Sequence, residues 1–166
     1  YTGIVWPFGD RIAVGFDWAN VGFDDQELSY SENKLNFSIG YQPFKLFSIG
    51  GTFKYLSRDM GLDGTSYGKS TGIGYDLGLL ISPHKKIRFG LGLYDLGGTN
   101  VTYKQNKVDE KILGQAFKLG IAYFPLDGLT MAMDLDNDRI HVGGEYFIKN
   151  RIGFRAGFQQ DLSGEE

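Results

Sequence analysis

The sequence lacks several features that would assign it to a common class of protein. Its 166 residues contain no cysteine, which excludes disulfides, thiolate metal sites and cysteine nucleophiles. No apolar run approaches the roughly 18 residues that mark a membrane-spanning helix, and no basic segment followed by an apolar stretch marks a signal peptide. The net charge is −3 and no basic run occurs, so we predict no nucleic-acid partner.

Glycine and a regular alternation are what the sequence has in excess. Glycine accounts for 25 residues, and aromatic residues make up 15% of the chain. In the stretch 70–95, bulky apolar residues occupy every second position, with glycine and a few charged residues between them. Successive side chains of a β-strand point to opposite faces, so this period of two predicts a hairpin with its turn at Ser82–Lys86.

The same alternation recurs along the whole chain, and no stretch has the 3.6-residue period of a helix. It predicts about ten strands, at 1–6, 11–20, 34–42, 46–58, 70–81, 87–95, 115–124, 129–136, 139–148 and 151–160. Short turns join the strands at one end, and the polar stretches 21–33, 59–69 and 96–114 are predicted as long loops at the other. This asymmetry is typical of outer-membrane barrels. We therefore predict an all-β fold, an antiparallel up-and-down meander of about ten strands, in one barrel domain over residues 1–166.

Two kinds of barrel fit such a meander. In a soluble ligand-binding barrel the apolar face lines the cavity, whereas in a membrane barrel it meets lipid and the lumen is polar. Glycine dominates the polar face here, and it weakens a water-exposed strand but makes room on a crowded inner wall. We therefore predict a transmembrane β-barrel, with a soluble lipid-binding β-protein as the alternative.

This choice assigns a side to each face of the strands. The apolar residues predicted to face lipid are Ile73, Tyr75, Phe89 and Leu91. Charged residues of both signs are predicted to face the lumen, where pairing compensates for lost hydration. They are Asp17, Lys54, Arg58, Asp76, Arg88, Lys118, Asp134, His141, Glu145 and Arg155.

No catalytic or metal site is predicted. The stretch Asp134-x-Asp136-Asn137-Asp138 has the alternate oxygen side chains of a Ca²⁺ loop, but the EF-hand glycine and distal glutamate are missing. His141 and Glu145 share a face, yet the sequence places no nucleophile beside them. We therefore expect no enzyme activity, no metal and no cofactor.

Five runs of the sequence, taken in order, resemble one known family. They are Lys54–Asp59 (KYLSRD), Gly72–Leu80 (GIGYDLGLL), Arg88–Gly98 (RFGLGLYDLGG), Met133–Tyr146 (MDLDNDRIHVGGEY) and Phe154–Gln159 (FRAGFQ). Their order and spacing resemble the PorV/PorQ-type, FadL-like outer-membrane barrels. The resemblance implies a larger barrel of about fourteen strands with an N-terminal plug. We therefore expect this chain to be an internal segment that lacks the plug region and the C-terminal strands.

The resemblance also implies what the protein does. FadL-like barrels carry fatty acids or other hydrophobic compounds, so we expect passage of hydrophobic small molecules across the bacterial outer membrane. Other members are accessory barrels of a protein-secretion system, and the alternative is a scaffold that holds an envelope or secretion protein on loops 21–33, 59–69 and 96–114. Membrane lipid or detergent is the expected partner under both functions.

Overall fold

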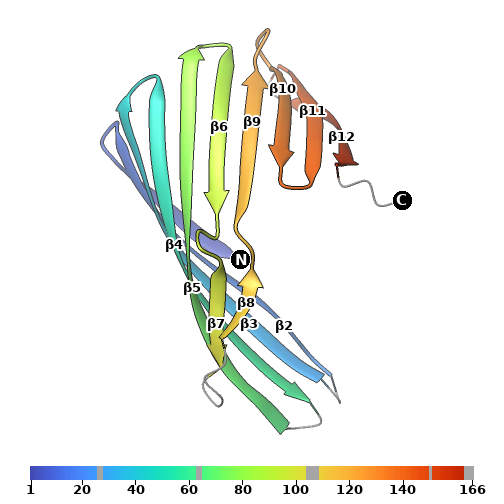
Figure 1. Ribbon diagram of the computed structural model, residues 1–166. Coiled ribbons are helices and arrows are strands. Elements are labelled where there is room, and N and C mark those ends of the chain that lie inside the picture. The colour runs from blue at the N-terminus through green and yellow to red at the C-terminus, as the bar shows by residue number, and fades with distance from the viewer. Residues whose placement is uncertain (26–27, 63–64, 104–108, 150, 163–166) are drawn as a thin grey trace. The chain divides into compact units, whose positions relative to one another are not determined.

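Alternating large and small residues form strands through nearly all of the described chain (Figure 1). The computed structural model describes residues 1–25, 28–62, 65–103, 109–149 and 151–162. These ranges hold twelve strands and no helix, so no described helix can cross a membrane. The strands are β1 (Thr2–Phe8), β2 (Ile12–Asp24), β3 (Leu28–Phe44), β4 (Phe47–Leu62), β5 (Thr65–His84), β6 (Ile87–Tyr94), β7 (Thr99–Tyr103), β8 (Asp109–Leu113), β9 (Ala116–Tyr123), β10 (Leu129–Asp136), β11 (Arg139–Ile148) and β12 (Ile152–Asp161).

Most strands pair with their neighbours in the sequence. The order in the sheet runs from β1 to β6, continues with β9 and ends at β12. β7 leaves this path and pairs with β5 and β8, through partners such as Gly72↔Val101 and Val101↔Glu110. The pairings with a defined register are antiparallel. The predicted all-β antiparallel meander is confirmed, with twelve described strands instead of about ten.

The three predicted loops are largely strand, so that part of the prediction is wrong. In 21–33, partners such as Val21↔Glu32 extend the β2–β3 ladder. β4 and β5 extend into 59–69, and β7 and β8 occupy much of 96–114. Strand pairing is a backbone interaction, so a polar stretch without an apolar face can continue a ladder. The predicted loop residues 26–27, 63–64 and 104–108 lie outside the described residues.

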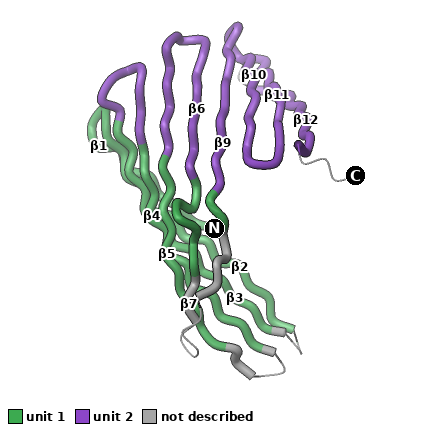
Figure 2. Tube along the Cα trace, viewed as in Figure 1, with its two compact units in different colours: residues 1–41, 50–77, 94–115 green, residues 42–49, 78–93, 116–166 purple. Residues whose placement is uncertain are grey.

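The chain divides into two compact units (Figure 2). Unit 1 comprises residues 1–41, 50–77 and 94–115, and unit 2 comprises residues 42–49, 78–93 and 116–166. Strands β3, β4, β5 and β6 each contribute residues to both units. A single barrel domain over residues 1–166 stays a prediction.

The interior of unit 1 is polar. Apart from glycine, its buried residues among those described are Lys54, Leu56, Ser70, Asp95 and Thr99. On β4 the two neighbours of Lys54 point the other way: Phe53 and Tyr55 are 40% and 38% exposed, whereas Lys54 is 5% exposed. A soluble protein ordinarily buries such aromatic residues and exposes lysine. The alternation therefore separates a buried polar face from an exposed apolar face.

Candidate functional site

A buried cluster of charged side chains joins β4, β5 and β7 in unit 1. Lys54 Nζ lies 2.6 Å from Asp76 Oδ1 and 2.6 Å from Asp95 Oδ1. Thr99 donates its hydroxyl to Asp95 Oδ1 at 2.6 Å. Because the Lys54 side chain is only 6% exposed, its charge depends on these two carboxylates for compensation.

The local sequence explains why these side chains meet. Asp95 and Gly98 have positive φ angles of 51° and 82°, so the chain turns sharply between β6 and β7. Asp76 Oδ1 accepts a hydrogen bond from the Asp95 backbone N–H at 2.9 Å, which holds this turn against β5. Gly74 provides the space, because a Cβ at that position would collide with Thr99 Oγ1. The cluster therefore fixes the point where β7 leaves the main path of the sheet.

A second ion pair links the polar extensions of β3 and β4. Arg58 donates Nη2 to Glu32 Oε2 at 2.7 Å, and Tyr30 donates its hydroxyl to the same oxygen at 2.5 Å. Tyr30 and Glu32 lie within 21–33, outside the strands predicted to span the membrane, whereas Arg58 is the last residue of the strand predicted at 46–58. Burial acts to raise the pKa of Glu32, but the hydrogen bonds from Tyr30 and Arg58 outweigh it and hold that pKa below its usual value.

Unit 2 carries a floor of small residues between two polar rows. Four cross-strand partners on β9 to β12 form the floor: Ala122, Ala132, Gly143 and Gly157. One polar row consists of Thr130, Glu145 and Arg155, and the other of Asp134, His141 and Gln159. Each row is two residues from the floor along its strands, so at about 3.3 Å per residue the rows stand about 13 Å apart.

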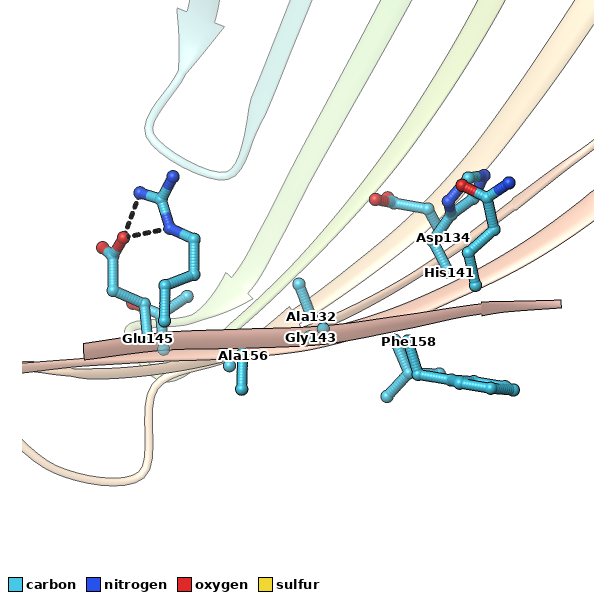
Figure 3. Close-up of a pocket in the computed structure, with 13 residues that line it drawn as sticks. Ala132, Asp134, His141, Gly143, Glu145, Ala156 and Phe158 are labelled. Atoms are coloured by element: carbon cyan, nitrogen blue, oxygen red, sulfur yellow. Dashed lines mark hydrogen bonds and ion pairs between the residues drawn. The ribbon is translucent and has the colours of Figure 1, made fainter.

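A hollow of about 580 Å³ is lined by three residues of this floor, Ala132, Gly143 and Gly157, and by both polar rows. Figure 3 shows Glu145 at one end and Asp134 and His141 at the other, while Ala156 points to the opposite side of the strands. Arg155 donates Nε to Glu145 Oε2 at 2.7 Å, so the charges at that end compensate each other. The hollow thus has polar ends and an uncharged middle, a shape and polarity suited to a small, largely apolar molecule.

The ten charged residues predicted to face the lumen form local pairs. Six of them pair with one another, as Lys54–Asp76, Lys118–Asp134 (3.9 Å) and Arg155–Glu145. The remaining four have other partners: Asn36 Nδ2 donates to Asp17 at 2.7 Å, Arg58 binds Glu32, His141 Nε2 lies 3.0 Å from Asp136 Oδ2, and the Arg88 guanidinium carbon lies 4.9 Å from the centre of the Phe124 ring. That all ten face a lumen stays a prediction.

Three acidic partners were missed by sequence reasoning. Glu32 and Asp136 occupy the same alternate positions as the polar-face residues of β3 and β10, so extending the alternation could have identified them. Asp95 has the parity of the apolar face of β6, and only its left-handed backbone brings it to the polar side. Alternation alone therefore could not have identified Asp95.

The four residues predicted to face lipid differ in their exposure. Ile73, Tyr75 and Phe89 are exposed, whereas Leu91 is half-buried. Contact with lipid stays a prediction for all four.

Comparison with known proteins places the fold. No protein-family model and no curated protein matches the sequence. A solved structure titled CymD monoaromatic hydrocarbon channel is similar, with a TM-score of 0.69 and 15% sequence identity, over 97% of this chain and 68% of that one. A Pseudomonas aeruginosa FadL homologue gives a TM-score of 0.68 and 12% identity, over 96% of this chain and 59% of that one. The PorV/PorQ part of the resemblance stays a prediction, and the chain has a FadL-like fold that spans about two thirds or less of the length of these structures.

Proposed function

We propose that this chain forms part of the wall of an outer-membrane channel for hydrophobic small molecules. The observation that carries the proposal is the burial of Lys54 between the exposed side chains of Phe53 and Tyr55. Lipid is the surrounding in which an exposed apolar face and a paired polar interior are both favourable. The likeness to a monoaromatic hydrocarbon channel supports a hydrophobic cargo.

The floor on β9 to β12 is the proposed contact for that cargo. Alanine and glycine leave space over the strands, and the paired charges at both ends leave the middle uncharged. A flat apolar molecule can lie on this floor without displacing water from a charged group. Cargo of the size of a single aromatic ring fits a hollow of about 580 Å³ with room to move.

The membrane assignment is tested on β6 with single-cysteine variants, since the chain contains no cysteine of its own. Phe89→Cys and Leu91→Cys carry a fluorescent label on the predicted lipid face, and Gly90→Cys carries it on the opposite face. In vesicles with brominated lipid, we expect strong quenching at Phe89 and Leu91 and weak quenching at Gly90. Equal quenching at the three positions, or a folded monomer without detergent, would contradict the membrane assignment.

The cargo assignment is tested with two alanines on opposite faces. Ala132→Phe fills the floor, whereas Ala156→Phe adds the same bulk on the opposite side of the strands. We expect Ala132→Phe to reduce toluene uptake by cells several-fold and Ala156→Phe to leave it near the wild-type rate. Equal uptake by the two variants, at matched amounts in the outer membrane, would remove the floor from the pathway.

A further inference from the structure

We infer that the short-turn end of unit 2 binds the phosphate head groups of anionic phospholipids. Four turns form this end; their described residues are 43–46, 84–87, 124–128, and 148–149 with 151–152. They contain a single carboxylate, Asp127, and five exposed cations: Lys45, Lys85, Lys86, Lys149 and Arg151. The whole chain has a net charge of −3, so this excess of positive charge is local.

Backbone hydrogen bonds hold the four turns side by side. One bond at 2.7–2.8 Å ties each turn to the next turn or to the strand beside it: Ser82 N to Leu46 O, Phe124 N to Lys86 O, and Phe147 N to Gly128 O. Lys86 Nζ also donates to Pro125 O at 2.8 Å, which joins the second and third turns. Figure 2 shows the turns at 42–49 and 85–86 at the upper end of the purple unit. The cations therefore form a row and are not scattered.

The cations in this row have no carboxylate partner among the described residues, although Lys86 donates to the Pro125 carbonyl. Within the described ranges, none of the five lies within 4.0 Å of a carboxylate oxygen. Elsewhere in the described chain, Arg11, Lys34 and Arg88 likewise lack a carboxylate within that distance, whereas six cations have one: Lys54, Arg58, Lys69, Lys118, Arg139 and Arg155. The uncompensated charge of the row is thus available to an external anion.

Exposed apolar side chains accompany these cations and indicate which anion fits. Phe44, Leu46, Leu126 and Ile152 lie in the same turns and are 53–70% exposed. Large apolar groups beside lysine and arginine match the bilayer interface, where the apolar part enters the acyl region and the cation reaches phosphate. A soluble acidic protein would account for the cations but not for these apolar residues. The occupant we assign is therefore an anionic phospholipid, and the assignment rests on the proposed membrane function.

The test measures lipid selectivity by electron spin resonance. The protein is reconstituted in phosphatidylcholine vesicles with spin-labelled phosphatidylglycerol or spin-labelled phosphatidylcholine, and the motionally restricted fraction of each label is compared. The first variant carries Lys45→Gln, Lys85→Gln, Lys149→Gln and Arg151→Gln; it keeps Lys86, whose Nζ binds Pro125. The matched control removes three lysines and one arginine elsewhere, as Lys34→Gln, Lys69→Gln, Lys118→Gln and Arg139→Gln.

We expect the wild-type protein to prefer phosphatidylglycerol by about threefold or more at low salt, and high salt to weaken the preference. The turn variant should lose most of this preference, and the control variant should keep it. Equal selectivity in the two variants, or no preference in the wild type, overturns the inference. If there is no preference but a motionally restricted phosphatidylcholine fraction is present, the protein still lies in the bilayer and only the head-group inference fails. If neither labelled lipid shows a restricted fraction, the proposed membrane function is contradicted as well.

Discussion

At the scale of single residues, Lys54 shows how the polar interior of unit 1 is stabilised. Replacing it by methionine keeps the length of the side chain but leaves Asp76 and Asp95 close together without a cation. We expect Lys54→Met to lower the free energy of unfolding by about 3–5 kcal/mol, measured by urea titration in lipid vesicles. Lys118→Met is the control, since its pair with Asp134 is longer and about 40% exposed and should cost less than about 1 kcal/mol. Equal losses in the two variants would show that burial of the pair is unimportant.

Gly74 is a second residue whose role is set by its immediate surroundings. Gly74→Ala places a methyl group against Thr99 Oγ1 and 3.1 Å from Lys54 Cε, so we expect a loss of about 1–3 kcal/mol in unfolding free energy. Gly78→Ala on the same face of β5 meets nothing within 4 Å and should be neutral or slightly stabilising. Chemical denaturation of the two variants measures the difference. A neutral Gly74→Ala would mean that Thr99 moves aside without loss.

At the scale of elements, the polar extensions of β3 and β4 should open in acid. The pKa of Glu32 is held below its ordinary value of 4.5, so the folded state gains stability from the ionised carboxylate above that pH. This contribution is lost as the pH falls below 4.5 and through the lowered pKa. We expect amide hydrogen exchange near Tyr30 and Arg58 to accelerate over that window. The Glu32→Gln variant should exchange faster already at pH 7 and show a flatter pH dependence, and an unchanged profile in this variant would contradict the assignment.

Alternation in the sequence predicts which residues share a face, but not where strands end. The hairpin of 70–95 is predicted correctly because its apolar positions alternate through residues 71–81 of β5 and through β6. The extension of β2 and β3 past Asn20 was missed because the stretch has no apolar face, although its backbone pairs as regularly as before. β7 was missed for a related reason, since the turn that starts it depends on Asp95 and Gly98 adopting positive φ angles.

At the scale of the whole molecule, the candidate site depends on register between strands. Ala122, Ala132, Gly143 and Gly157 are small residues at unremarkable positions of four strands, and only the pairing of β9 to β12 aligns them. The alternation in the sequence predicts on which face of its strand each residue lies, and hence which face is polar. It does not contain the offsets between strands, so the floor could not be predicted from it.

The two ends of the strand order lead to the last prediction. Among the described strands, β1 pairs with β2 alone and β12 pairs with β11 alone. Unpaired backbone N–H and C=O groups cost several kcal/mol each in hydrocarbon, so a strand edge in a bilayer must be covered. We expect the β12 amides that point away from β11 to exchange as slowly in lipid nanodiscs as those of β10, with the turn at Gly9 as the fast reference. Fast exchange of alternate β12 amides would mean that this edge meets water, and β12 would then lie outside the membrane wall.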